Sequence, residues 1–103
     1  MLVLFGGTGY AGAKPADQAF SAGLAGTGGG IGLRDTAAKL VDSAGYGTAT
    51  NAFVETHAAA APPSSTPPGS SEIRIPDGKD TDDNSADFTV TAAPTPGAPN
   101  VAG

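Results

Sequence analysis

The chain has 103 residues, a net charge of −5 and no cysteine. A chain of this length forms at most one small domain, which buries only about 60–65% of the surface of its unfolded state. The five basic residues are scattered singly, so no basic face is available to neutralise phosphates and we expect no nucleic-acid binding. Without cysteine there is no disulfide framework, no thiolate metal site and no thiol nucleophile.

The predicted core is thin. Alanine accounts for 20 residues, whereas leucine, isoleucine, valine and phenylalanine together number only 17. That share lies below the roughly 20% at which a chain begins to lack the apolar surface needed for folding. We therefore expect marginal stability.

The first apolar run, Leu2–Phe5, ends at two glycines. A short continuous apolar run of this kind is typical of a strand that is buried on both faces. Five apolar residues are too few for the core of a signal peptide or for a membrane span. We expect a buried strand here and no membrane span.

The Gly6–Gly12 loop follows that strand and resembles the G-x-x-G-x-x-G loop of short-chain dehydrogenases, where glycines let a pyrophosphate approach a helix N-terminus. Dinucleotide binding would need a helix next and further β-α-β units after Asp35. Each interior glycine costs such a helix roughly 1 kcal/mol relative to alanine. Glycines recur there at Gly23, Gly26 and Gly28–Gly30. We favour a glycine-rich loop between strands, and the alternative is a fragment of an NAD(P)-dependent short-chain oxidoreductase.

A hairpin is predicted in the middle of the chain. Ile31 and Leu33 alternate with smaller or polar residues, and 35–39 supplies a polar connection. The return strand runs through 40–47. Within it, Tyr46 is expected to supply a large apolar face and keep its hydroxyl at the rim.

The segment 57–72 is rich in alanine, proline and serine and precedes the next large apolar residue. It cannot bury enough surface to offset its ordering entropy, so we expect a flexible loop.

Just before it, Phe53–Val54 predicts a brief strand or an anchoring loop. His57, the single histidine, is expected to be exposed, without the fixed partner that a general base needs. We assign no catalytic residue and predict that the protein is not an enzyme.

Two apolar alternations, Ile73/Ile75 and Phe88/Val90, flank a polar tip and predict two strands joined by a turn-rich loop. Arg74 on the first strand is expected to pair with a carboxylate from 80–87. The tip itself, 77–87, contains five aspartates, and their oxygens are ligands that Ca²⁺ prefers.

Calcium binding by this tip is one of two interpretations. Asp80, Asp82 and Asn84 match the first ligand positions of an EF-hand, but Ser85 replaces its glycine and Thr91 its glutamate. The EF-hand is therefore excluded. An irregular calcium loop at 77–87 stays open beside turns in which these side chains bond their own backbone. We assign no metal-binding or cofactor-binding residue.

The C-terminal third resembles the lamin tail domain of bacterial surface and secreted proteins. Arg74, the G-x-D-T-D-D-N loop at Gly78–Asn84, the pair Asp87–Phe88 and the exit Pro94–Gly97 carry the resemblance. It implies an all-β, immunoglobulin-like sandwich over residues 1–100, followed by a tail at 101–103. The family's tryptophan-containing strand has no counterpart here. We therefore expect an incomplete sandwich, the C-terminal portion of such a domain, with long glycine-rich and proline/serine-rich loops.

The resemblance also implies a function. It predicts a non-catalytic binding or structural module, secreted or extracellular, that contacts an unknown protein or cell-surface partner and uses no cofactor. An incomplete sandwich leaves an unpaired strand edge and an uncovered apolar face. Self-association through that edge is therefore expected.

Overall fold

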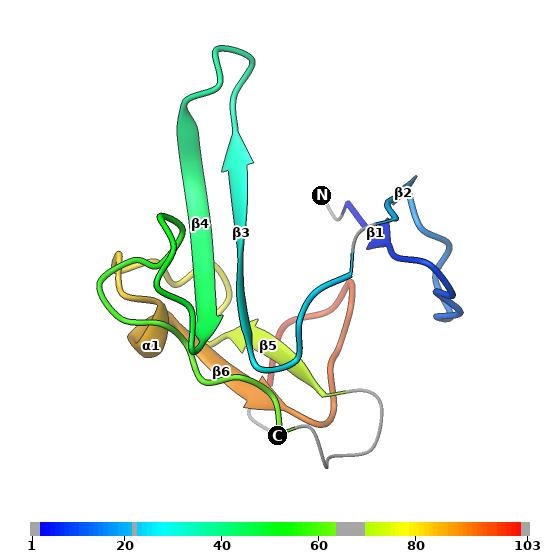
Figure 1. Cartoon of the computed structure of the whole chain (residues 1–103). Coiled ribbons are helices and arrows are strands. Elements are labelled where there is room, and N and C mark those ends of the chain that lie inside the picture. Colours follow the sequence, from blue (N-terminus) through cyan, green and yellow to red (C-terminus); the bar gives the residue numbers. More distant parts are fainter. Residues whose placement is uncertain (1–2, 22, 64–69, 102–103) are drawn as a thin grey trace.

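Six strands pair into three two-stranded sheets (Figure 1). The structure is a computed structural model that describes residues 3–21, 23–63 and 70–101. One turn of helix precedes the last strand. In chain order the elements are β1 (Phe5–Gly6), β2 (Gln18–Ala19), β3 (Gly28–Arg34), β4 (Leu40–Gly47), β5 (Ser71–Arg74), α1 (Asn84–Asp87) and β6 (Phe88–Thr91). The predicted all-β class is confirmed.

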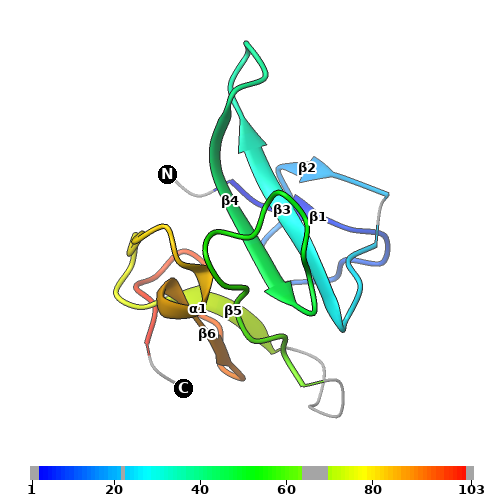
Figure 2. The same cartoon turned by 60° about the vertical axis from the view of Figure 1, so that its left-hand side comes forward.

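The antiparallel β3–β4 hairpin is the longest element and confirms the hairpin predicted in the middle of the chain. Ile31 pairs with Ala44 and Leu33 with Asp42. The connection is closed by Asp35, whose backbone N–H bonds the Lys39 carbonyl at 2.9 Å. In Figures 1 and 2 the tip of this hairpin stands clear of the other elements.

Gly30, Gly32 and Gly45 lie on one face of the hairpin, against the segment after β4. A Cβ on Gly32 would lie 2.6 Å from the Phe53 ring, and one on Gly45 would overlap the Val54 side chain. These two positions therefore need glycine for close approach. Phe53 and Val54 lie outside any strand, so of the two predicted alternatives the anchoring loop is confirmed.

The C-terminal hairpin, β5–β6, confirms the second predicted strand pair, with Ile73 opposite Thr89 and Arg74 opposite Phe88. Strand β5 ends at Arg74, so Ile75 lies beyond it. Ile73 and Ala59 are the two buried apolar residues among those described. The core is as thin as the composition predicts.

Helix α1 lies in the connection that the sequence predicts to contain only turns. Asp83 is its N-cap, and the Asp83 side chain accepts a hydrogen bond from the Ser85 backbone N–H. A single turn carries too weak a periodicity to be recognised in a sequence. No helix in the described ranges is long and apolar enough to cross a membrane.

The predicted N-terminal strand differs from the observed one. Leu2 lies outside the described residues, and β1 holds only Phe5 and Gly6, paired in parallel with β2. Val3 and Phe5 are exposed, so the prediction of a strand buried on both faces is wrong. The physical reason is that burial on two faces requires layers on both sides, and β1 makes its contacts with β2.

The predicted flexible loop 57–72 also needs correction at both of its ends. Ala59 is buried and bridges β4 in parallel: its N–H bonds the Gly45 carbonyl at 2.8 Å, and its carbonyl accepts from Gly47 N–H at 2.7 Å. Backbone hydrogen bonds thus hold a segment that has no large apolar side chain. At the other end, Ser71 already belongs to β5. Residues 64–69 of the predicted loop and 102–103 of the predicted tail lie outside the described residues.

Candidate functional site

Asn84 is the centre of a buried polar network that joins both hairpins. Its side chain is fully buried. Its Oδ1 accepts from the backbone N–H groups of Gly45 (2.8 Å) and Glu55 (2.9 Å). Its Nδ2 donates to the Ser43 carbonyl (3.3 Å) and to Glu55 Oε2 (3.1 Å). Every hydrogen-bonding position of the amide is used, which is the condition under which a buried polar side chain specifies a fold.

Asp87, at the end of α1, is a second buried polar residue, with 1% of its surface exposed. Its carboxylate accepts from Thr81, from the backbone N–H at 2.8 Å and the hydroxyl at 2.7 Å. Burial alone would raise the pKa of Asp87, but the hydrogen bonds from Thr81 and Asp83 and the charge of Arg74 outweigh it and lower the pKa. Asp87 is therefore ionised at neutral pH.

Arg74 connects this network to the β3–β4 hairpin. Its guanidinium lies 3.1 Å from Asp42 Oδ2, 3.8 Å from Asp87 Oδ2 and 3.9 Å from Asp80 Oδ1. It also stacks over the Phe88 ring at 4.3 Å. Pairing with a carboxylate from 80–87 is confirmed. The nearest carboxylate, Asp42 on β4, was missed because it lies 32 positions away in the sequence.

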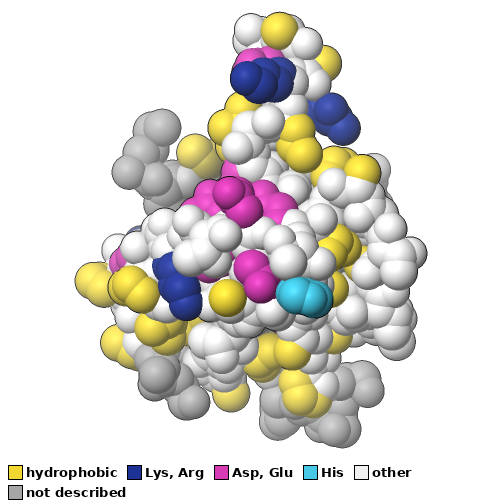
Figure 3. Space-filling model, turned by 90° about the vertical axis from the view of Figure 1, so that its left-hand side faces the viewer, with side chains coloured by type: hydrophobic (Ala, Val, Ile, Leu, Met, Phe, Trp, Pro, Cys, Tyr) yellow, Lys and Arg dark blue, Asp and Glu magenta, His cyan; other side chains and the backbone are white. Residues whose placement is uncertain are grey.

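Figure 3 shows an acidic surface, a patch of aspartate and glutamate side chains on one face of the molecule. Asp42, Glu55 and Asp80 each offer a carboxylate oxygen, and these oxygens lie within 4.8 Å of one another. Burial, and then the charges of Asp42, Asp80 and Asp82, raise the pKa of Glu55. Such oxygens suit a hard cation. In this structure, however, Arg74 already supplies positive charge to Asp42 and Asp80.

The predicted calcium loop, 77–87, contributes only Asp80 to that acidic surface. Four of its five carboxylates accept hydrogen bonds from backbone or side-chain groups, namely those of Asp77, Asp80, Asp83 and Asp87. Asp77 accepts from the Asn100 backbone N–H at 2.8 Å, and Asp80 itself accepts from the Asp82 N–H at 3.2 Å. This pattern favours the interpretation in which aspartates shape the turns. Calcium binding by 77–87 stays a hypothesis.

His57 is exposed, as predicted, with its Nδ1 3.3 Å from Asp83 Oδ2. Ser85 donates its hydroxyl to the other oxygen of the same carboxylate at 2.7 Å. The Ser85 hydroxyl first, and then His57, lower the pKa of Asp83. Both side chains thus bond the aspartate. A nucleophilic serine would instead have to bond the histidine, so this trio lacks the order of a catalytic triad.

Within the Gly6–Gly12 loop, the Tyr10 ring packs against Gly6 and Gly12. A Cβ on Gly6 would lie 3.2 Å from the Tyr10 ring, and one on Gly12 would overlap the same ring. Tyr10 donates its hydroxyl to the Lys14 carbonyl. The segment then enters β2, and no helix follows Gly12 within the described ranges before β3. The helix N-terminus that pyrophosphate binding needs is not formed there.

The sequence singles out Asn84 and Asp87 but does not predict that both are buried at the centre of this network. Both stand in a polar, turn-rich segment, where such residues are typically exposed. The available signal was their place in the motif that resembles the lamin tail domain, as Asn84 ends its loop and Asp87 precedes Phe88. Comparisons with protein-family models, curated proteins and solved structures found no match to this chain.

Proposed function

We propose that this chain is a non-catalytic binding or structural module of an exported protein, an incomplete immunoglobulin-like sandwich of the lamin-tail type. The observation that carries the proposal is the exposure of large apolar side chains on the β3–β4 hairpin: 54% at Ile31, 62% at Leu33 and 61% at Val41. Clustered exposed apolar residues mark interaction sites in soluble proteins. The motif at residues 73–97 supports the extracellular location.

The partner that fits this hairpin is a second copy of the chain. Among the described residues β3 pairs only with β4, so its outer edge leaves backbone N–H and C=O groups unpaired. Such an edge accepts an additional strand. Two copies present the same edge to each other, which allows a twofold-symmetric antiparallel pairing that sets the exposed side chains of the two β3 strands beside each other as cross-strand neighbours.

Sedimentation velocity from about 10 μM to about 1 mM protein tests the proposal across the range expected for weak homodimers. The wild type is expected to dimerise as its concentration rises. Leu33→Lys places a charge in the contact and is expected to stay monomeric. Val101→Lys, at an exposed valine outside the hairpin, is the matched control and is expected to behave as the wild type. A wild type that stays monomeric throughout would refute self-association.

The same preparation separates this module from an oxidoreductase. Because no helix follows Gly12 in the described residues before β3, and the Tyr10 ring packs against Gly6 and Gly12, NADPH at about 1 mM is expected to leave the melting temperature unchanged. Only a ligand that binds the folded state raises it. A rise in melting temperature with NADPH would favour the enzyme fragment instead.

A further inference from the structure

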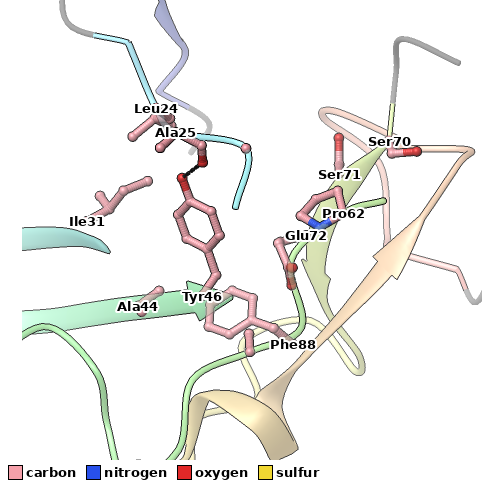
Figure 4. Close-up of a pocket in the computed structure, with 13 residues that line it drawn as sticks. Leu24, Ala25, Ile31, Ala44, Tyr46, Pro62, Ser70, Ser71, Glu72 and Phe88 are labelled. Atoms are coloured by element: carbon pink, nitrogen blue, oxygen red, sulfur yellow. Dashed lines mark hydrogen bonds between the residues drawn. The ribbon is translucent and has the colours of Figure 1, made fainter. Parts of the chain in front are cut away.

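A pocket of about 500 Å³ lies between the two antiparallel hairpins. Its volume falls within the range of small-molecule sites. The lining is mainly apolar, and its largest side chains are Leu24, Ile31, Tyr46, Pro62 and Phe88 (Figure 4). The Tyr46 hydroxyl donates to the Ala25 carbonyl, which fixes the ring as one wall. The predicted role of Tyr46, an apolar face with a polar tip, is confirmed.

Glu72 on β5 also lines this pocket, and it is the one acidic residue among the described residues of the lining. Both of its carboxylate oxygens are buried, and neither accepts a hydrogen bond from the part of the chain that the structure describes. The basic residue of the same strand, Arg74, is already paired with Asp42. A buried carboxylate without a partner is strongly disfavoured in the ionised state. Accordingly, burial raises the pKa of Glu72.

We propose that this pocket binds a small primary amine whose ammonium group pairs with Glu72 and whose apolar part packs against Tyr46 and Phe88. An ammonium group provides both the positive charge and the N–H donors that the carboxylate lacks. Aromatic rings at the pocket wall stabilise a cation further. Because both carboxylate oxygens are buried, pairing with the ammonium group requires a rotation about the side-chain bonds of Glu72 toward the pocket.

Other ligand classes fit the pocket less well. An anion would be repelled by Glu72. A neutral apolar molecule would fill the volume but leave the carboxylate without a partner. A hard metal ion needs several oxygen ligands, and the described lining offers one carboxylate among mainly apolar side chains. The amine is the class that satisfies both the charge and the apolar surface.

The inference goes beyond the proposed function, because it requires neither self-association nor export. Its test is calorimetric titration of the full chain with 2-phenylethylamine and with 2-phenylethanol, a neutral analogue of nearly the same shape. The amine is expected to bind at least about tenfold more tightly than the alcohol, a ratio that one charge-assisted hydrogen bond supplies. Equal affinities, or no binding of the amine at about 10 mM, would overturn the proposal.

Two charge-removing variants locate the effect. Glu72→Gln keeps the shape but removes the charge, and is expected to abolish the preference for the amine. Asp82→Asn is the matched control, because Asp82 is exposed and does not line the pocket. It is expected to keep the preference. If Glu72→Gln keeps the preference as well, the amine is held by general charge attraction and the proposed site is wrong. Leu33→Lys is expected to bind the amine normally, which separates this result from that of the dimerisation test.

Discussion

Replacing Asn84 with alanine removes four hydrogen bonds from the centre of the protein. Two of the groups that lose their partner are the backbone N–H groups of Gly45 and Glu55, and each unsatisfied donor costs about 1–3 kcal/mol. The Ser43 carbonyl and the Glu55 carboxylate contribute less, because the carboxylate is half-exposed and can be solvated by water. We expect a total loss of about 3–5 kcal/mol, a large part of the roughly 5–15 kcal/mol that stabilises a domain of this size.

Urea unfolding followed by circular dichroism measures this loss. Ser85→Ala is the matched control, because Ser85 is the next residue of the same helical turn and its hydroxyl bond is exposed. We expect the control to change the free energy of unfolding by no more than about 0.5 kcal/mol. Asn84→Asp keeps the acceptor oxygen but sets a second carboxylate against Glu55, so its deficit relative to the wild type should shrink as pH falls. A loss below about 1 kcal/mol for Asn84→Ala would refute the reasoning.

Three further variants test the rest of the network. The pKa of Asp87 is lower in the folded state than in the unfolded state, where it lies near 4. Ionised Asp87 therefore stabilises the fold above about pH 4, and this stabilisation is lost as the pH falls through the folded pKa. In Asp87→Asn, the melting temperature should fall less steeply below about pH 4 than in the wild type. Gly45→Ala should lower the free energy of unfolding by about 1–3 kcal/mol in the same urea assay, because the new methyl group overlaps Val54. Gly23→Ala, where a Cβ meets nothing within 4 Å, is its control and should stay within about 0.5 kcal/mol of the wild type. Arg74→Lys retains the positive charge but loses the planar guanidinium and its stacking on the Phe88 ring. We expect the free energy of unfolding to fall by about 1–3 kcal/mol. An unchanged free energy of unfolding would show that the charge alone is sufficient.

The two hairpins were predictable because their signals are local. Ile31 and Leu33, like Phe88 and Val90, alternate with a period of two, which is the repeat of a strand wherever its partner lies. The strand expected at Leu2–Phe5 failed for a related reason. An apolar run shows that the side chains would be more stable if buried. Whether they are buried depends on a second layer that covers the strand, and in the described fold Val3 and Phe5 stay exposed.

The polar network could not be predicted in the same way. Asn84 bonds groups that lie 29, 39 and 41 positions earlier in the chain. No periodicity links residues at such separations, and asparagine in a turn-rich segment is typical of an exposed bend. The composition did predict a thin apolar core, and only two buried apolar residues are found among those described. The hydrogen bonds of the Asn84 side chain therefore contribute stability that a larger apolar core would otherwise provide.

The order of these contacts along the chain bears on how the protein is made. A ribosome adds about 5–20 residues per second, so roughly 2–8 s separate the emergence of the β3–β4 hairpin from that of Asn84. During that interval the nascent hairpin has no acceptor for the Gly45 and Glu55 amides that Asn84 later binds. The buried polar network that joins the two hairpins can therefore form only late in translation, after Asn84 has been added.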